Sequence, residues 1–189
     1  VASLLAHLGS SEAVEVFAGM NAVVEDFNIG NFSRSTAKFD AHDLEFLNAK
    51  VLHDMPYAEA EPRLKALGLD EAVLAEKGEA FWMAVRGNLK LFKDAANWWT
   101  ICFDAHAPSI EDTDFMAEAA ALLPEEPWGG DTWSQWTGAV KETTGRKGKG
   151  LFLPLRMALT GLGHGPELKL LLPLMGRDRA LKRVQGLTA

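Results

Sequence analysis

The chain has 189 residues, of which 48% are hydrophobic, and its formal net charge is −7. This composition excludes an intrinsically disordered chain and allows one large or two small globular cores. No run approaches the roughly 18 to 20 consecutive apolar residues of a membrane span, and residues 1–9 lack the charged leader of a signal peptide. We therefore expect a cytoplasmic protein with no membrane partner. Val1 lies part way into an apparent helix, which suggests a fragment of a longer protein.

The charges are distributed unevenly along the chain. From Lys141 to Ala189, ten Lys and Arg stand against three Asp and Glu, net +7, whereas the preceding residues carry nine against 23, net −14. An acidic body with a basic terminal segment restricts polyanion binding to one surface while the rest repels it. The net charge alone argues against nucleic-acid binding, but its distribution favours it.

Apolar residues recur at intervals of three and four along most of the chain, and the alternation typical of strands is hard to find. We therefore predict helices almost throughout. The first extends from Glu12 to Phe27, and its apolar face carries Val16, Met20, Val23 and Phe27.

Short helices are predicted in the next part of the chain. Asp40 can cap a helix that stops near Met55 and Pro56. Another helix ends near Leu67, and Asp70 can cap the short helix that follows it.

The clearest helical pattern runs from about Glu79 to Trp99. Its apolar residues form one stripe: Phe81, Val85, Leu89, Phe92, Ala96 and Trp99. Arg86, Lys90 and Lys93 are also spaced by four and three, which places a basic stripe about 100° from the apolar one. A solvated helix face is the alternative interpretation of these three cations.

The second half of the chain contains two interruptions. Ser109, with Asp112 three residues on, resembles a capping box. The segment Pro124–Gly130 contains two Pro and two Gly, which makes it the best candidate boundary between two helical subdomains. We assign residues 1–125 to the first subdomain and 126–189 to the second.

Three further helices are predicted in the second subdomain. The first carries Trp133 and Trp136, the second covers residues 152–159, and the third opens at Pro166 and closes at Gly176. The predicted fold class is therefore all-α, with two packed helical bundles joined by a short linker.

No catalytic or metal site is predicted from the residues. The chain contains no Gly-rich phosphate loop after a strand, no paired Cys or His at zinc spacing and no Ser-His-Asp arrangement. Cys102 lies among aromatic residues and is expected to be a small core hydrophobe rather than a nucleophile. Trp98, Trp99 and Trp136 are likewise expected in the core, although such rings could stack on unpaired bases.

A second cluster of cations lies in a glycine-rich segment, residues 144–150. Arg146, Lys147 and Lys149 alternate with glycines whose backbone can approach phosphates closely. Arg156 follows, and its guanidinium could hydrogen-bond a phosphate or a base edge. A solvated charge run is an equally common explanation of this pattern.

Several segments together resemble the C-terminal half of class I glutamate–tRNA ligases. In chain order they are Ser3-Leu4-Leu5-Ala6-His7-Leu8-Gly9, Lys38-Phe39-Asp40, Asp43-Leu44, Leu47-Asn48-Ala49-Lys50, Val85-Arg86, Asp94-Ala95-Ala96-Asn97-Trp98-Trp99, Thr144-Gly145-Arg146-Lys147-Gly148-Lys149, Leu151-Phe152, Pro154-Leu155-Arg156, Ala158-Leu159-Thr160-Gly161 and Gly165-Pro166-Glu167-Leu168. The resemblance covers essentially the whole chain, and the segments from Thr144 onward are the most specific because they fix more than a dozen residues in order.

The resemblance implies helical stem-contact and anticodon-binding bundles of the glutamyl-tRNA synthetase type, which bind a glutamate-accepting tRNA. The parent enzyme would use ATP and magnesium to adenylate glutamate and then transfer it to a ribose hydroxyl of the tRNA. The two nucleotide-binding signatures of the catalytic core do not occur in this sequence. We therefore expect the isolated chain to be a non-catalytic monomer without cofactors of its own, whose partners are tRNA and the catalytic domain of the same polypeptide.

The resemblance also assigns residues. Arg86 falls where the family places a basic residue near the anticodon, and Lys147, Lys149 and Arg156 fall in the basic motif of the terminal bundle. With the two spacing patterns, the predicted RNA-binding set is Arg86, Lys90, Lys93, Arg146, Lys147, Lys149 and Arg156. The alternative is a helical protein-interaction or regulatory domain derived from the same bundle, whose basic segment would meet an acidic protein surface.

Overall fold

Every regular element in the described part of the chain is a helix. The computed structural model describes residues 2–10, 14–17, 19–34, 37 and 39–189. Within these ranges the β-type pairing consists of one isolated bridge between Ser10 and Phe32. The all-α prediction is therefore confirmed.

The helices follow one another with mostly short connections. The α-helices are α1 (Ala2–His7), α2 (Met20–Asp26), α3 (Ala41–Asp54), α4 (Tyr57–Ala66), α5 (Glu71–Val85), α6 (Ala95–Phe103), α7 (Thr113–Ala121), α8 (Thr132–Thr144), α9 (Lys149–Thr160), α10 (Leu168–Met175) and α11 (Arg177–Val184). The short 3-10 helices are η1 (Ile29–Asn31), η2 (Arg86–Asn88) and η3 (Phe92–Asp94).

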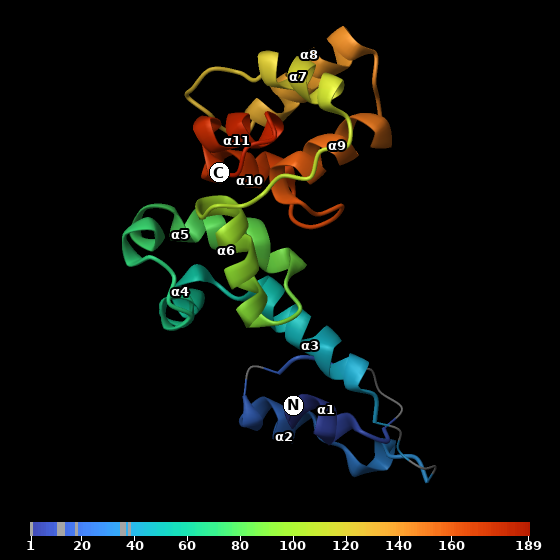
Figure 1. Cartoon of the computed structure of the whole chain (residues 1–189). Coiled ribbons are helices and arrows are strands. Elements are labelled where there is room, and N and C mark those ends of the chain that lie inside the picture. Colours follow the sequence, from blue (N-terminus) through green and yellow to red (C-terminus); the bar gives the residue numbers. More distant parts are fainter. Residues whose placement is uncertain (1, 11–13, 18, 35–36, 38) are drawn as a thin grey trace.

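The helices are arranged in three tiers (Figure 1). The first tier holds α1, α2 and the beginning of α3, the second holds α4 to α6, and the third holds α7 to α11. Helix α3 links the first two tiers, and α10 links the second to the third because it contacts α5 and α6 as well as α8 and α11. One hydrophobic core runs through the last two tiers, from Leu52 to Val184.

Several predicted helix boundaries are confirmed. The Asp40 side chain accepts the backbone N–H of His42 at 2.8 Å at the start of α3. Asp70 caps α5, although this helix has 15 residues rather than the short length predicted. Gly176 ends α10, as predicted, and Gly145 ends α8.

The helix predicted from Glu12 to Phe27 is much shorter than expected. Glu12 lies outside the described residues, residues 14–17 are irregular, and α2 begins only at Met20. Gly19 stands before it in an extended conformation, where a residue with low helix propensity can stop the helix from extending backwards. Met20 and Phe27 are exposed rather than part of a buried face.

The helix predicted from Glu79 to Trp99 is interrupted, so the prediction of one continuous helix was wrong. Helix α5 ends at Val85, η2 and η3 follow, and α6 begins at Ala95. The prediction was correct in its burial, because every residue of the apolar stripe is buried or packs against the core.

The interruption has a local cause in the sequence. Gly87 and Asn88 have low helix propensity, so the chain leaves the helix at this point. The carboxylate of Asp94 then accepts the backbone N–H of Leu91 at 3.0 Å, which closes the turn that precedes α6.

Two other predicted helix starts move by a few residues. Asp112 itself caps α7, because its Oδ1 atom accepts the backbone N–H of Phe115 at 3.0 Å. Ser109 lies in the connection before α7, so the predicted capping box is wrong. Helix α10 begins at Leu168 rather than at Pro166.

The predicted subdomain boundary falls inside the third tier. Segment Pro124–Gly130 connects α7 to α8, and α7 contacts both α8 and α11. A different connection, residues 104–112, runs from the second tier to the third (Figure 1). The division into residues 1–125 and 126–189 stays a prediction.

A buried arginine holds the second and third tiers together. The Arg183 side chain on α11 is fully buried. Its guanidinium donates to the main-chain oxygens of Ile101 at 2.6 Å, Leu159 at 2.8 Å, Asp104 at 3.2 Å and Ala189 at 2.6 Å. Burial lowers the pKa of Arg183 to about 10, so the side chain keeps its charge at neutral pH. The ends of α6, α9 and the chain therefore meet at one cation.

Cys102 lies next to this region and is fully buried, as predicted. Burial raises the pKa of its thiol to about 12, which leaves almost no thiolate at neutral pH. The structure therefore supports a packing role for this residue rather than a nucleophilic one.

We expect Arg183→Lys to lower the free energy of unfolding by about 3 to 5 kcal/mol, because a compact ammonium leaves several buried carbonyl groups unpaired. Urea denaturation followed by tryptophan fluorescence measures the loss. Lys182→Ala, an exposed neighbour on the same helix, is the control and should change the value by about 0.5 kcal/mol or less. Equal losses in the two variants would contradict the role given to Arg183.

Candidate nucleic-acid interface

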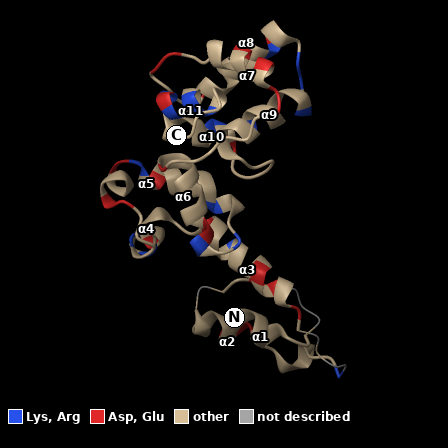
Figure 2. Cartoon of the chain, in the orientation of Figure 1, with Lys and Arg blue, Asp and Glu red and all other residues tan. Residues whose placement is uncertain are grey.

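The seven predicted RNA-binding residues fall into two groups. Arg86, Lys90 and Lys93 lie in the second tier, between α5 and α6. The other four lie in the third tier, on the connection between α8 and α9 and on α9 itself: Arg146, Lys147, Lys149 and Arg156. Figure 2 shows basic residues along the α8–α9 connection and acidic residues along the α7–α8 connection.

The three cations of the second tier do not form a helical stripe, because the helix that was predicted to carry them is interrupted. Arg86 lies in η2, Lys90 in the following loop and Lys93 in η3. Both lysines are exposed. The predicted common basic face on one helix is therefore wrong, and a contact of each residue with RNA stays a prediction.

Arg86 has a structural role that the sequence did not reveal. Its Nη1 atom donates to the main-chain oxygen of Met55 at 2.8 Å, and Trp82 Nε1 donates to the same oxygen at 2.8 Å. Met55 ends α3, so Arg86 fastens the end of that helix to the second tier.

The α8–α9 connection presents two lysines that the fold does not use. Gly145 and Gly148 adopt positive φ angles of 70° and 55°, which lets the chain turn sharply between the two helices. Lys147 and Lys149 are exposed. Neither side chain makes a hydrogen bond or an ion pair with the described part of the chain, so both ammonium groups are available to a ligand.

Arg146 lies in the same connection but is already paired. Its Nη2 atom lies 2.5 Å from Asp112 Oδ2, and its guanidinium carbon lies 4.0 Å from the centre of the Phe115 ring. The hydrogen bond from Arg146 holds the pKa of the Asp112 carboxyl below its usual value, and the backbone N–H of Phe115 adds to this effect. The carboxylate is therefore ionised at neutral pH.

Arg156 lies in the wall of a small cavity on α9. The cavity has a volume of about 260 Å³, and Trp133, Phe152, Glu167, Leu168 and Lys169 also line it. Arg156 Nη2 donates to the Pro166 main-chain oxygen at 3.0 Å, whereas the buried Nη1 has no partner among the described residues. Burial also lowers the pKa of Arg156.

A second cavity adjoins the first and is lined by both Lys149 and Arg156. It has a volume of about 220 Å³, and Lys149, Phe152 and Arg156 line it with Leu153 and Gly163. Phe152 and Arg156 therefore face both cavities, and one of the unpaired lysines of the loop lies at the same site.

The aromatic residues of this site were not predicted from the sequence. The rings of Trp133 and Phe152 lie 6.2 Å apart, and Phe152 is 45% exposed. Phe152 lies just after the basic loop, in the first turn of α9. This position was the signal that the sequence offered. The tryptophans weighed as base-stacking candidates, Trp98, Trp99 and Trp136, are instead buried in the core, as expected.

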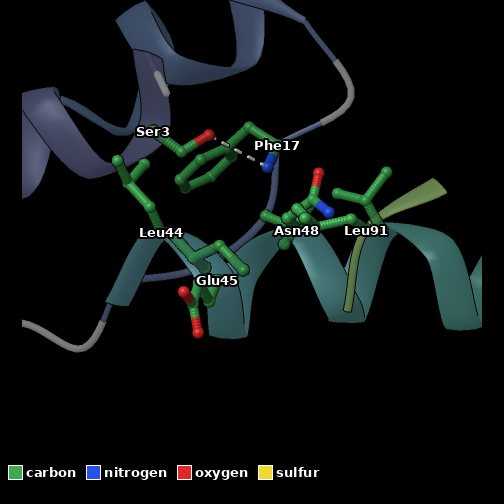
Figure 3. Close-up of a pocket in the computed structure, with 9 residues that line it drawn as sticks. Ser3, Phe17, Leu44, Glu45, Asn48 and Leu91 are labelled. Atoms are coloured by element: carbon green, nitrogen blue, oxygen red, sulfur yellow. Dashed lines mark hydrogen bonds between the residues drawn. The ribbon is translucent and has the colours of Figure 1, made fainter. Parts of the chain in front are cut away.

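A third cavity, of about 370 Å³, lies between the first tier, α3 and the loop before α6 (Figure 3). Its lining is mostly apolar and includes no Lys or Arg from the described residues. The hydroxyl of Ser3 accepts the backbone N–H of Phe17 at 3.4 Å, and Asn48 donates to the main-chain oxygen of Lys90 at 2.5 Å. These polar groups hold the fold, so the cavity offers no site for a phosphate.

Neither a metal site nor a membrane span is found in the described part of the chain. No three His, Cys, Asp or Glu side chains there are grouped so that they could hold a metal ion. No helix there has the length and apolar character needed to cross a bilayer.

Comparison with known proteins identifies a family for most of the chain. Residues 61–187 match the family described as "Anticodon binding domain". Glutamate–tRNA ligase 2 of a Methylobacterium strain is 54% identical over 186 residues, which are 98% of this chain and 41% of that protein. Glutamate–tRNA ligase 1 of Parvibaculum lavamentivorans is 53% identical over 98% of this chain and 40% of its own length. The chain therefore spans about two fifths of the length of these relatives.

A solved structure shares the fold. The glutamate–tRNA synthetase from Elizabethkingia anophelis superposes with a TM-score of 0.71 at 21% identity, over 96% of this chain and 38% of that chain. The three-tier helical arrangement is therefore one that an experimentally solved protein also adopts.

We expect Lys147→Ala and Lys149→Ala each to weaken the binding of single-stranded RNA of any sequence, because unpaired ammonium groups contact phosphates rather than bases. Each change should reduce the slope of log affinity against log salt by about 0.7. Filter binding across a salt series measures both quantities. Lys65→Ala is the control, since Lys65 lies on α4 and is paired with Glu61 at 2.9 Å. Unchanged slopes for both loop variants would mean that the RNA surface lies elsewhere.

Proposed function

The chain belongs to the anticodon-binding domain family, and on this premise we propose that it is the part of a glutamate–tRNA ligase that binds and orients the tRNA. The proposed ligand is the anticodon loop of a glutamate-accepting tRNA. Relatives more than 50% identical carry the name glutamate–tRNA ligase. This identity extends over nearly the whole chain, which supports the assignment of all three tiers to one role.

The grouping of Arg156 with aromatic rings and one unpaired lysine, Lys149, carries this proposal. An unstacked base needs an aromatic or apolar wall and a hydrogen-bond donor at its edge. Trp133 and Phe152 supply such a wall. Arg156 lines the same cavity, and its guanidinium would offer planar N–H donors to the edge of a bound base.

The phosphate groups on either side of that base are the proposed targets of the loop. Lys149 lines the same cavity as Arg156, and Lys147 lies two residues away in the sequence. Exposed lysines bind phosphates without reading sequence, so they would hold the strand while the arginine discriminates. This division of roles separates affinity from specificity within one short segment.

The ligation itself is proposed to take place on a part of the ligase outside the two fifths represented by this chain. ATP and magnesium would be bound there, and glutamate would be adenylated and then transferred to the tRNA. The tiers described above would fix the position of the tRNA relative to that part. We also propose that the protein acts as a monomer in the cytoplasm.

We expect the chain to bind glutamate tRNA more tightly than the same tRNA with an altered anticodon, and Arg156→Lys to reduce this preference by about tenfold or more. The reason is that lysine keeps the charge but loses the planar set of donors that can read a base edge. Arg63→Lys on α4 is the matched control, and it should leave the preference unchanged. Equal binding of both tRNAs by the unaltered chain would refute anticodon recognition, and strong binding to an acidic protein instead would favour an interaction domain.

We expect the isolated chain to show no glutamate-dependent exchange of pyrophosphate with ATP. Such exchange requires groups that hold a triphosphate beside a carboxylate, and the sequence contains neither of the two nucleotide-binding signatures of the ligase core. The assay uses labelled pyrophosphate and purified chain. Exchange above the level given by heat-denatured chain would disprove the assignment of the chemistry to another part of the ligase.

A further inference from the structure

Asp112 and Arg146 meet where two connections of the third tier come together. Asp112 is the N-cap residue of α7, and Arg146 follows Gly145 at the end of α8. The two oxygens of Asp112 have separate partners: Oδ1 accepts the backbone N–H of Phe115 at 3.0 Å, and Oδ2 lies 2.5 Å from Arg146 Nη2. The Asp112 carboxylate therefore connects the start of α7 to the loop that follows α8.

The Arg146 side chain is held on more than one side. Its guanidinium also lies over the Phe115 ring at 4.0 Å, an arrangement that attracts a cation to the ring face. The backbone N–H of Arg146 donates to Thr144 Oγ1 at 3.2 Å. Side-chain exposure is 37% for Arg146 and 39% for Asp112, so neither partner is fully solvated.

The loop that this pair holds has little intrinsic order. The connection between α8 and α9 has four residues, 145–148, and two of them are Gly145 and Gly148. Glycine loses more conformational entropy than other residues when it is ordered, so such a loop needs a fastening contact to keep one shape. Lys147 and Lys149 contribute no such contact, and Arg146 does.

We propose that the Asp112–Arg146 pair, packed on Phe115, is a positioning device that fixes the α8–α9 loop for RNA, and that Arg146 does not itself contact phosphate. The proposal rests on the proposed function of the chain as an RNA-binding module. It revises the prediction that all three cations of the loop bind RNA in the same way. Arg146 is a positioning residue, and Lys147 and Lys149 are the contacts.

The direction in which Asp112→Asn changes RNA affinity distinguishes a positioning role of Arg146 from a direct contact. A carboxylate close to a polyanion repels it, so removal of the Asp112 charge should strengthen RNA binding if Arg146 is merely released to bind a phosphate. If the pair positions the loop, the same removal should weaken binding, because the two lysines lose their fixed direction. Asp112→Asn is suited to this test because asparagine caps a helix about as well as aspartate.

The experiment is a double-mutant cycle of Asp112→Asn, Arg146→Gln and both changes together, with filter binding of glutamate tRNA across a salt series. We expect each variant to bind about threefold to fivefold more weakly, a range set by the strength of partly exposed ion pairs. The double variant should be no weaker than either single variant, because both remove one interaction. Equal or tighter binding by Asp112→Asn would overturn the proposal, as would additive losses in the double variant.

A measurement without RNA separates this proposal from the proposed function. The backbone heteronuclear NOE of Lys147 and Gly148 should fall in Asp112→Asn, while the values within α7 stay unchanged. If the unaltered chain fails to bind tRNA, the proposed function fails and this measurement alone decides whether the pair orders the loop. NOE values equal to those of the unaltered chain would show that the pair does not hold the loop, whatever the result of the binding assay.

Discussion

The structure depends on one buried guanidinium. Arg183 donates to main-chain oxygens at the end of α6, at the end of α9 and at Ala189. The oxygens of Ile101 and Leu159 lie in the last turns of α6 and α9, where the carbonyl groups lack an intrahelical partner. A cation with five N–H groups satisfies several of them at once and is attracted by the negative ends of the helix dipoles. The angle between the second and third tiers is therefore set by a polar contact inside an apolar core.

The neighbouring contacts make this junction rigid. Arg179, one turn before Arg183, donates to the main-chain oxygens of Cys102 at 2.9 Å and Phe103 at 2.8 Å. The backbone groups of His106 and Ala189 also pair with each other, so the connection between the tiers runs beside the last residue of the chain. The connection is thus held along its course, which fixes how the third tier faces the second.

The wall of the candidate base site depends on the same junction. A Cβ atom at Gly165 would overlap the ring of Trp98 on α6, and Gly165 has a φ angle of 139°, so glycine is required on both counts. The loop that contains Gly165 packs on the second tier, and Arg156 donates to Pro166 in the same loop. The cavity around Arg156 therefore takes its shape from contacts in both tiers.

Sequence periodicity predicted most of this fold because the spacing of buried residues is a local property. The stripe from Phe81 to Trp99 was correctly assigned to the core even though the helix is broken within it, since residues of a helix–turn–helix segment can share one core. The break itself depended on Gly87, Asn88 and the Asp94 turn, and a spacing pattern does not weigh such local competition. For the same reason, Arg86, Lys90 and Lys93 were predicted to lie on one continuous helix, which the structure does not contain at these residues.

The candidate site was only partly predictable because its residues come together through tertiary contacts. Lys147 and Lys149 could be named as candidates from composition alone, because the exposure of a Gly-rich segment does not depend on a distant partner. The pairing of Arg146 with Asp112 joins residues 34 positions apart, and the Trp133 ring near Phe152 depends on how α8 packs on α9. No spacing rule connects residues so distant in the chain.

The basic terminal segment also separates its two kinds of cation by role. All five arginines from residue 141 onward donate to protein oxygens: Arg146, Arg156, Arg177, Arg179 and Arg183. Of the five lysines, Lys169 alone forms an ion pair within the described part of the chain, with Glu167 at 2.6 Å. Guanidinium groups are planar, weakly hydrated and rich in donors, so they suit carbonyl groups inside a fold, whereas ammonium groups stay solvated at its surface. The net charge of this segment therefore overstates the number of cations free to meet RNA. In the proposed role, the whole segment would supply the long-range attraction, and the few unpaired lysines would supply the direct phosphate contacts.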